Sequence, residues 1–217
     1  MIKIALIAIS LLCGKPQDVA TFSNYCSEGK IAEAAELIKN DPDLIHEFHE
    51  EGYQPIHIAV TCNQIELIKL IISLQPDALY AKTKNGYTPF HLAVFSNNLQ
   101  TLKHLYQQDQ SIITVRSDHG DTALTLAAYK GFLPIIDFIL QERPDLIHES
   151  SNIGAAIHRA AQFGHLAVVK RLVEADPSVA TKEDFQGCTP LRLAQMCEHQ
   201  DIIDFLTIQD TEIETLE

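Results

Sequence analysis

The sequence predicts an all-α solenoid of about six helix-turn-helix units with short β-turn fingers. Three groups of residues recur in step, and each marks a different part of the unit. Glycine returns at intervals of 34 or 33 residues, at Gly52, Gly86, Gly120, Gly154 and Gly187. The other groups are a block such as Thr88-Pro89-Phe90-His91 and a pair such as Asp41-Pro42. A fixed period in this range indicates a repeat array, in which each unit buries its apolar face against its neighbours.

A short first helix is predicted to begin at the block that follows each glycine. The oxygen of Thr88 can cap free backbone N–H groups, and Pro89 takes a position where no N–H is needed. A column of small residues then lets neighbouring helices approach closely: Ala59, Ala93, Ala127, Ala160 and Ala194. The helix is predicted to end at residues that tolerate a left-handed backbone, namely Asn63, Asn97, Gly131 and Gly164.

A second helix is predicted after each of these residues. Apolar side chains recur three and four positions apart from Ile65 to Ile72, and the pattern returns from Leu133 to Leu140. The proline of the third group stops this helix. An extended stretch is then expected to lead to a turn such as Asn85-Gly86, where a positive φ is favoured.

The columns resemble the ankyrin repeat family, most closely in the run from Gly86 to Ala93. The resemblance covers residues 50 to 206 well, and a degenerate unit precedes it. It implies an N-terminal segment at 1–15, a degenerate repeat at 16–49, repeats at 50–83, 84–117, 118–151 and 152–184, and a capping repeat with an acidic tail at 185–217. It also implies paired antiparallel helices with a concave binding face, and hydrogen bonds from His57, His91 and His158 that tie loops together.

Two units depart from the family pattern. Thr125 stands where histidine is usual, and Ala155 stands where threonine caps the first helix. For the unit with Ala155, we expect a distorted turn and a weaker helix cap.

The composition limits the class of partner and the compartment. A net charge of −13 and a pI of about 5.1 argue against nucleic acid and anionic membranes, and favour a basic protein partner. The charge could equally serve solubility alone. The five cysteines form no Cys-x-x-Cys pair, which indicates reduced thiols and a cytoplasmic protein.

The two ends of the chain leave alternatives open. Residues 1–15 read either as a hydrophobic capping helix or as a signal-like segment, which would place the protein in the periplasm or outside the cell. The acidic tail from Thr211 to Glu217 looks like the C-terminal export signals of ankyrin proteins that intracellular bacteria secrete into host cells, or is simply a frayed end.

The sequence carries no recognisable catalytic, cofactor or metal motif. The run His46-Glu47-Phe48-His49 does not match His-Glu-x-x-His, because its second histidine comes one residue early. Phosphate-binding loops and nucleophile elbows are not found either. We therefore predict a protein that is not an enzyme and that holds no cofactor or metal.

Large apolar side chains stand in two columns of the first helices, where little core is expected. Exposed aromatic residues commonly anchor partner proteins. With the tyrosines that follow two finger glycines, they give the predicted partner-binding set: Tyr53, Tyr87, Phe95, Tyr129, Lys130, Phe163 and Met196. We expect at least three of its six aromatic and methionine side chains to be exposed. Acidic finger residues, namely Glu50, Glu51, Asp118 and Asp121, are expected to rim the site.

The sequence thus predicts a monomeric adaptor or scaffold that binds a protein through its concave face and finger tips. The alternatives are a secreted bacterial effector that masks or inhibits a host protein, and a regulatory or inhibitory subunit of an enzyme.

Overall fold

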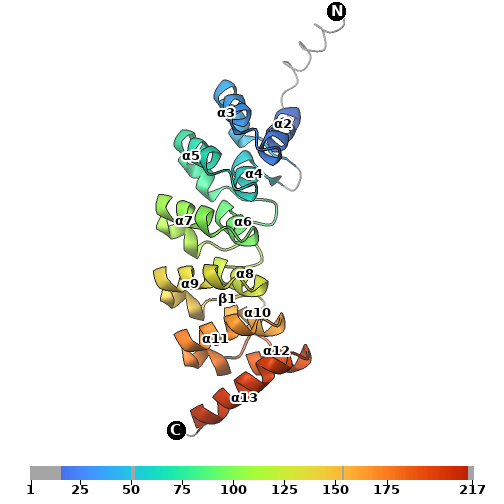
Figure 1. The fold of residues 1–217 in the computed structure, drawn as a ribbon, viewed down its shortest axis with the longest axis vertical. Coiled ribbons are helices and arrows are strands. Elements are labelled where there is room, and N and C mark those ends of the chain that lie inside the picture. Colours follow the sequence, from blue (N-terminus) through green and yellow to red (C-terminus); the bar gives the residue numbers. More distant parts are fainter. Residues whose placement is uncertain (1–15, 50–51, 153, 215–217) are drawn as a thin grey trace, which may run out of the picture. The chain divides into compact units, whose positions relative to one another are not determined.

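A computed structural model describes residues 16–49, 52–152 and 154–214, and nearly all of its regular structure is helical (Figure 1). The predicted all-α repeat class is confirmed. The chain divides into two compact units, residues 1–93 and 94–217. The predicted N-terminal helix or signal at 1–15 and the acidic pair Glu50-Glu51 lie outside the described residues.

The first unit holds two complete helix pairs. The pairs are α2 (Pro16–Ser27) with α3 (Ile31–Asn40) and α4 (Pro55–Thr61) with α5 (Ile65–Leu74), and 3₁₀ turns follow them at Pro42–His46 and Pro76–Tyr80. Helix α2 packs on α3 and α4, and α5 packs on α3 and α4. The boundary between the units falls within α6 (Pro89–Phe95).

The second unit continues the same pattern. It contains α7 (Leu99–Gln108), α8 (Ala123–Lys130), α9 (Leu133–Glu142), α10 (Ala156–Gln162), α11 (Leu166–Ala175), α12 (Pro190–Met196) and α13 (Gln200–Glu214). Its 3₁₀ turns are Gln110–Thr114, Pro144–His148 and Pro177–Thr181, and its strands are β1 (Ser150–Ser151) and β2 (Gly154–Ala155). The first helix α10 packs between α8 and α12, and the second helix α11 packs on α9 and α13.

The stretch after each second helix differs from the predicted extended chain, because a 3₁₀ turn comes first. Proline at the start of most of these turns fixes φ near the value that the turn needs. Where Asp109 and Asp176 precede the turn, their side chains accept hydrogen bonds from the backbone N–H groups of Ser111 and Ser178, both at 2.9 Å. Such caps make a short helical turn more stable than an extended chain.

The core of each repeat lies between its first and second helices. The predicted apolar stripes are buried, including Leu67, Ile68 and Ile71 in α5 and Ile135, Ile136 and Ile139 in α9. Each fully buried side chain of this size contributes about 1.5–3 kcal/mol relative to an exposed one. The predicted helix ends are also confirmed, since Asn63, Asn97, Gly131 and Gly164 all have positive φ.

The turn at residues 150–155 is distorted, as predicted. Strands β1 and β2 pair antiparallel there, with Ser150 opposite Ala155, and Gly154 has a φ of 115°, far from the 71–76° of the other finger glycines. The N–H of Ala155 donates to Nδ1 of His158 at 3.2 Å, as the N–H of Thr88 does to His91. Ala155 has no side-chain acceptor that could cap α10 in return. The helix cap is therefore weaker than in the neighbouring repeats.

Arg116 of the preceding finger supports this turn. Its guanidinium donates to the carbonyl oxygen of Ser150 at 2.7 Å and to that of Gly120 at 3.1 Å, and it pairs with the carboxylate of Glu149. Thr125, which replaces the repeat histidine, instead bonds locally to the backbone carbonyl of Thr122. The arginine thus links two fingers in the repeat where threonine forms only local hydrogen bonds.

Candidate functional site

Four of the predicted residues lie together in the second unit. The rings of Tyr129 and Phe163 meet edge to face, with centroids 4.5 Å apart and planes at 86°. The ammonium group of Lys130 lies 4.9 Å from the Tyr129 ring centroid and 5.8 Å from that of Phe95. Three successive repeats therefore contribute side chains to one cluster, on the side of α6, α8 and α10 where the sequence placed them.

Arg159 belongs to the same cluster, and the sequence analysis missed it. Its guanidinium carbon lies 4.8 Å from the ring centroid of Tyr129 and 5.2 Å from that of Phe163. Cations near aromatic faces at these distances are attracted by the ring quadrupole. We call Phe95, Tyr129, Lys130, Arg159 and Phe163 the aromatic–cation cluster.

A signal for Arg159 was present in the repeat pattern. The corresponding position in every other full repeat is aliphatic: Ile58, Leu92, Leu126 and Leu193. The first three of these are buried, whereas Arg159 is half-buried and its Nε atom is fully enclosed without a hydrogen-bond partner among the described residues. A charged residue in an aliphatic column departs from what packing alone requires.

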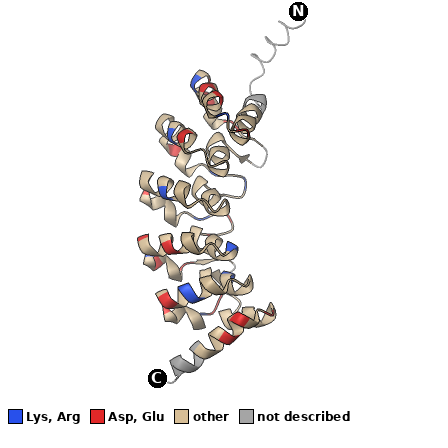
Figure 2. Ribbon diagram, viewed as in Figure 1, with Lys and Arg blue, Asp and Glu red and all other residues tan. Residues whose placement is uncertain are grey.

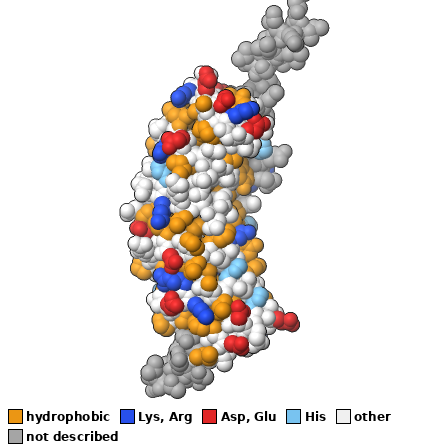
Figure 3. Space-filling model, viewed as in Figure 1, with side chains coloured by type: hydrophobic (Ala, Val, Ile, Leu, Met, Phe, Trp, Pro, Cys, Tyr) orange, Lys and Arg blue, Asp and Glu red, His pale blue; other side chains and the backbone are white. Residues whose placement is uncertain are grey.

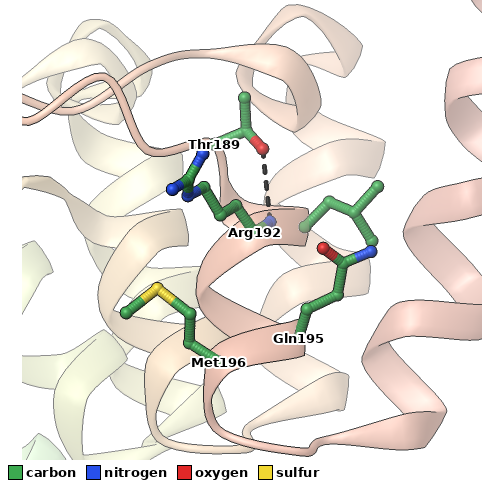
Figure 4. Close-up of a pocket in the computed structure, with 5 residues that line it drawn as sticks. Thr189, Arg192, Gln195 and Met196 are labelled. Atoms are coloured by element: carbon green, nitrogen blue, oxygen red, sulfur yellow. Dashed lines mark hydrogen bonds between the residues drawn. The ribbon is translucent and has the colours of Figure 1, made fainter.

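The remaining predicted residues lie outside this cluster. Tyr53 and Tyr87, in the first unit, meet His57 and His91 edge to face, with centroids 5.8 Å apart in both pairs. Met196 lines an open hollow of about 530 Å³ on α12, together with Thr189, Leu191, Arg192 and Gln195. The side chains of Arg192 and Met196 reach toward the same side of α12 in Figure 4, and the Thr189 hydroxyl accepts from the backbone N–H of Arg192.

The expected exposure is wrong for most of the set. Phe163 and Met196 are exposed, at 41% and 68%, while Tyr53, Tyr87, Phe95 and Tyr129 are half-buried. Stacking against a histidine, a cation or another ring covers part of these side chains. The expected acidic rim also needs correction, because Asp121 is only 5% exposed, with its carboxylate near the Ser117 hydroxyl.

A second hollow, of about 150 Å³, shares helix α10 with the cluster. Its lining comes from α10, α12 and two fingers, and consists of Asn152, Gln162, Asp184, Phe185, Gln186 and Leu193. Gln162 lies one helical turn from Arg159 on the same side of α10, since residues three apart are neighbours on a helix. We call the hollow and the cluster together the first-helix face of the second unit, since helix α10 contributes to both.

The sequence model for ankyrin repeats, which comprises three copies, matches residues 22–116, 75–150 and 144–216. The chain belongs to the ankyrin-repeat family. Ankyrin repeats are generally protein–protein interaction modules and are typically non-catalytic. No curated protein matches the sequence.

Two of the three repeat histidines, His57 and His158, form the hydrogen bonds to loops that the family resemblance implied. Nε2 of His57 lies 3.0 Å from the Ala81 carbonyl oxygen, and Nε2 of His158 lies 2.8 Å from that of Lys182. Burial lowers the pKa of His57 to about 4 and lowers that of His158 as well. Both imidazoles are thus held neutral, which suits a structural hydrogen bond to a carbonyl oxygen.

In this ankyrin-repeat protein, histidines of the following repeats contact the backbone of the first-helix face. Nε2 of His165 lies 2.9 Å from the Tyr129 carbonyl oxygen, at the end of α8. The ring approaches Gly131 so closely that a Cβ there would come within 2.6 Å of Nδ1. His199 forms the equivalent contact with the Gln162 carbonyl oxygen at 3.1 Å. The backbone that carries Tyr129 and Phe163 is therefore fixed by packing between repeats.

Charge is distributed unevenly among the elements of the ankyrin repeats. Figure 2 shows acidic residues on second helices such as α9 and α11, and on α13. Figure 3 shows acidic, basic and apolar side chains interspersed on the face turned toward the viewer. In contrast, the sequences of the first helices α4, α6, α8, α10 and α12 contain no aspartate or glutamate.

Other kinds of site find less support in the described parts of the chain. Residues 16–49, 52–152 and 154–214 hold no group of three or more His, Cys, Asp and Glu side chains placed to bind a metal ion. Within the same ranges, no helix has both the length and the apolar character that crossing a membrane requires. Cys26, Cys62, Cys188 and Cys197 are free thiols.

Proposed function

We propose that the protein is an adaptor that binds another protein through the first-helix face of the second unit. The observation that carries this proposal is the edge-to-face pair of Tyr129 and Phe163, half-exposed beside two cations. Aromatic and arginine side chains supply most of the binding energy in protein interfaces, because they bury large areas at low entropic cost. Binding alone would serve to tether or mask the partner.

The support of His165 and His199 strengthens the proposal. A binding surface whose backbone is already fixed loses little conformational entropy when a partner docks. A secreted effector or a regulatory subunit, the two alternative roles, would use the same surface. It also stays a prediction that acidic charge steers a partner of basic overall composition. The monomeric state stays a prediction as well, and light scattering would measure it.

The proposal is tested by capture of partners on immobilised protein from a lysate of the source cell. Wild type is compared with Phe163→Ala and with Leu74→Ala, whose side chain has a similar exposure, 48% against 41% for Phe163, but lies on the second helix α5. We expect a protein that is retained by wild type and Leu74→Ala and lost with Phe163→Ala. Partners that remain bound to Phe163→Ala would place the binding surface elsewhere.

We further propose a reducing, cytoplasm-like compartment, which the free thiols support. Burial raises the pKa of the Cys26 thiol to about 12, so that this group is a poor nucleophile and resists oxidation. Mass spectrometry of the native protein, with the N-terminus mapped, tests this proposal. A processed N-terminus or a disulfide in the isolated protein would contradict it.

A further inference from the structure

We propose that the first-helix face of the second unit recognises a carboxylate on an extended segment of its partner, with a bulky apolar side chain next to that carboxylate. Arg159 binds the carboxylate, and Phe163 contacts the apolar neighbour. This inference rests on the proposed function and specifies the chemistry of the partner at the point of contact.

The first helices of the second unit carry positive charge, although the whole chain is acidic. The chain has 29 acidic against 16 basic side chains, so its net charge alone favours a basic partner. The first helices reverse this balance, because α8, α10 and α12 carry Lys130, Arg159 and Arg192 and no carboxylate. Asp184, a carboxylate in the lining of the hollow, accepts hydrogen bonds from the backbone N–H groups of Gln186 and Cys188. Potentials at interfaces are complementary over short distances, so the group that docks on these helices is expected to be negative.

Arg159 lacks the carboxylate partner that three other arginines of this unit have. Arg116, Arg143 and Arg171 pair with Glu149, Asp145 and Asp137. Arg159 forms no ion pair with any described residue, and its enclosed Nε has no hydrogen-bond acceptor there. A buried donor without an acceptor is unfavourable, and a carboxylate fits the planar guanidinium with two parallel hydrogen bonds.

Aromatic rings surround the guanidinium of Arg159. Its carbon atom lies 4.8 Å from the ring centroid of Tyr129 and 5.2 Å from that of Phe163, and Phe163 is 41% exposed. Low-dielectric neighbours strengthen an ion pair. They also offer an apolar surface, and the hollow beside Gln162 and Leu193 has room for a side chain. The arrangement therefore favours an acidic residue that is followed or preceded by an aromatic or aliphatic one.

A polypeptide fits these features better than a nucleic acid does. A phosphate backbone places negative charge at every nucleotide and requires an extended basic surface. The described first helices offer only three cations, and the protein as a whole carries −13. A single carboxylate with an apolar neighbour matches a small positive site within an acidic protein.

The test is selection of short random peptides displayed on phage against the full-length protein, followed by fluorescence-polarisation titration of the enriched peptides. The main variant is Arg159→Leu, because leucine is the residue of the equivalent column and keeps the fold. The charge-matched control is Lys103→Gln. Lys103 lies on the second helix α7, and its ammonium nitrogen is 5.5 Å from the centroid of the Phe138 ring. A single-stranded oligonucleotide serves as competitor.

We expect enrichment of Asp or Glu beside an apolar residue, at least about a tenfold loss of affinity in Arg159→Leu, and no change in Lys103→Gln. Replacing the acidic residue of the peptide by its amide should cause a similar loss. Peptides that bind equally well to Arg159→Leu but lose affinity for Phe163→Ala would overturn the carboxylate inference and leave the proposed function standing. Selection that yields no binder, or binders indifferent to both variants, would overturn both. Displacement by the oligonucleotide would overturn the choice of a polypeptide.

Discussion

The imidazole Nε2 of His57 lies 3.0 Å from the carbonyl oxygen of Ala81, 24 residues further along the chain. This bond connects the first helix of one repeat to the finger of the next. Because the ring is buried, its pKa falls from 6.5 to about 4, and the neutral form is the one that the folded state favours. The link between repeats therefore depends on pH.

We predict that acid weakens the first unit before general acid unfolding. The unfolded chain binds a proton at His57 below pH 6.5, whereas the folded chain does so only near pH 4. Stability is therefore fully present above pH 6.5, is lost as the pH falls toward 4, and changes by about 3 kcal/mol in total. Urea unfolding of wild type and His57→Gln at several pH values measures the difference. A pH dependence that is identical in the two proteins would show that His57 does not titrate in this way; the exposed His119→Gln serves as control.

Restoring the missing cap should stabilise α10. In the equivalent column, Thr88, Thr122 and Thr189 precede their first helices, and the first two are buried like Ala155. Ala155→Thr is expected to raise the free energy of unfolding by about 0.5–1 kcal/mol, because the new hydroxyl can accept from the N–H of His158. Thermal unfolding measures this change. A lower melting temperature would mean that the turn around Gly154 has no room for the added atoms.

Arg116 should matter more than an ordinary surface arginine. We expect Arg116→Gln to cost about 1 kcal/mol and to speed hydrogen exchange of the backbone around Ser150, since two carbonyl oxygens lose their donor. Arg143→Gln is the control, because Arg143 bonds to the exposed Asp145 two residues away. That change should have a smaller effect on stability, because exposed ion pairs contribute little. Equal effects of the two substitutions would refute a special role for Arg116.

The two rings of the cluster should be energetically coupled. A double-mutant cycle of Tyr129→Ala and Phe163→Ala is expected to give a coupling energy of about 0.5–1.5 kcal/mol for an edge-to-face pair. Tyr106 and Phe138, with centroids 5.5 Å apart and planes at 88°, provide a matched pair on the second helices. Partner binding should be lost only with the first pair. If both pairs affect binding equally, the effect is one of stability rather than of contact.

We predict that Arg159 lowers the stability of the protein when no partner is bound. Arg159→Leu is expected to raise the free energy of unfolding by about 1 kcal/mol, because an enclosed Nε without an acceptor is replaced by the aliphatic residue of the column. Chemical denaturation of the two proteins without any partner measures this change. A loss of more than about 1 kcal/mol would indicate that the guanidinium instead stabilises the rings of Tyr129 and Phe163.

The sequence was sufficient for the fold because its signals are local and repeated. Glycine spacing, proline positions and apolar periodicity each determine backbone or packing within one repeat, and all point to the same unit. The 3₁₀ turns were missed because proline only marked the end of the preceding helix, and the aspartate caps were not considered. The cluster was found in part, since Phe95, Tyr129, Lys130 and Phe163 stand in columns where the repeat pattern predicts little core packing. Arg159 was not predicted because it occupies a core column, for which the repeat pattern predicts an aliphatic packing residue.

The contact between His165 and the Tyr129 carbonyl oxygen has a kinetic consequence. A surface that is already in its bound shape does not need to rearrange after the partner arrives, so encounter is limited mainly by diffusion and orientation. Differences in affinity among partners should then lie in how slowly they leave. For a partner segment that is disordered in solution, the entropic cost of binding would come from ordering that segment. The lifetime of the complex would then report how well the residues of the segment fit the protein.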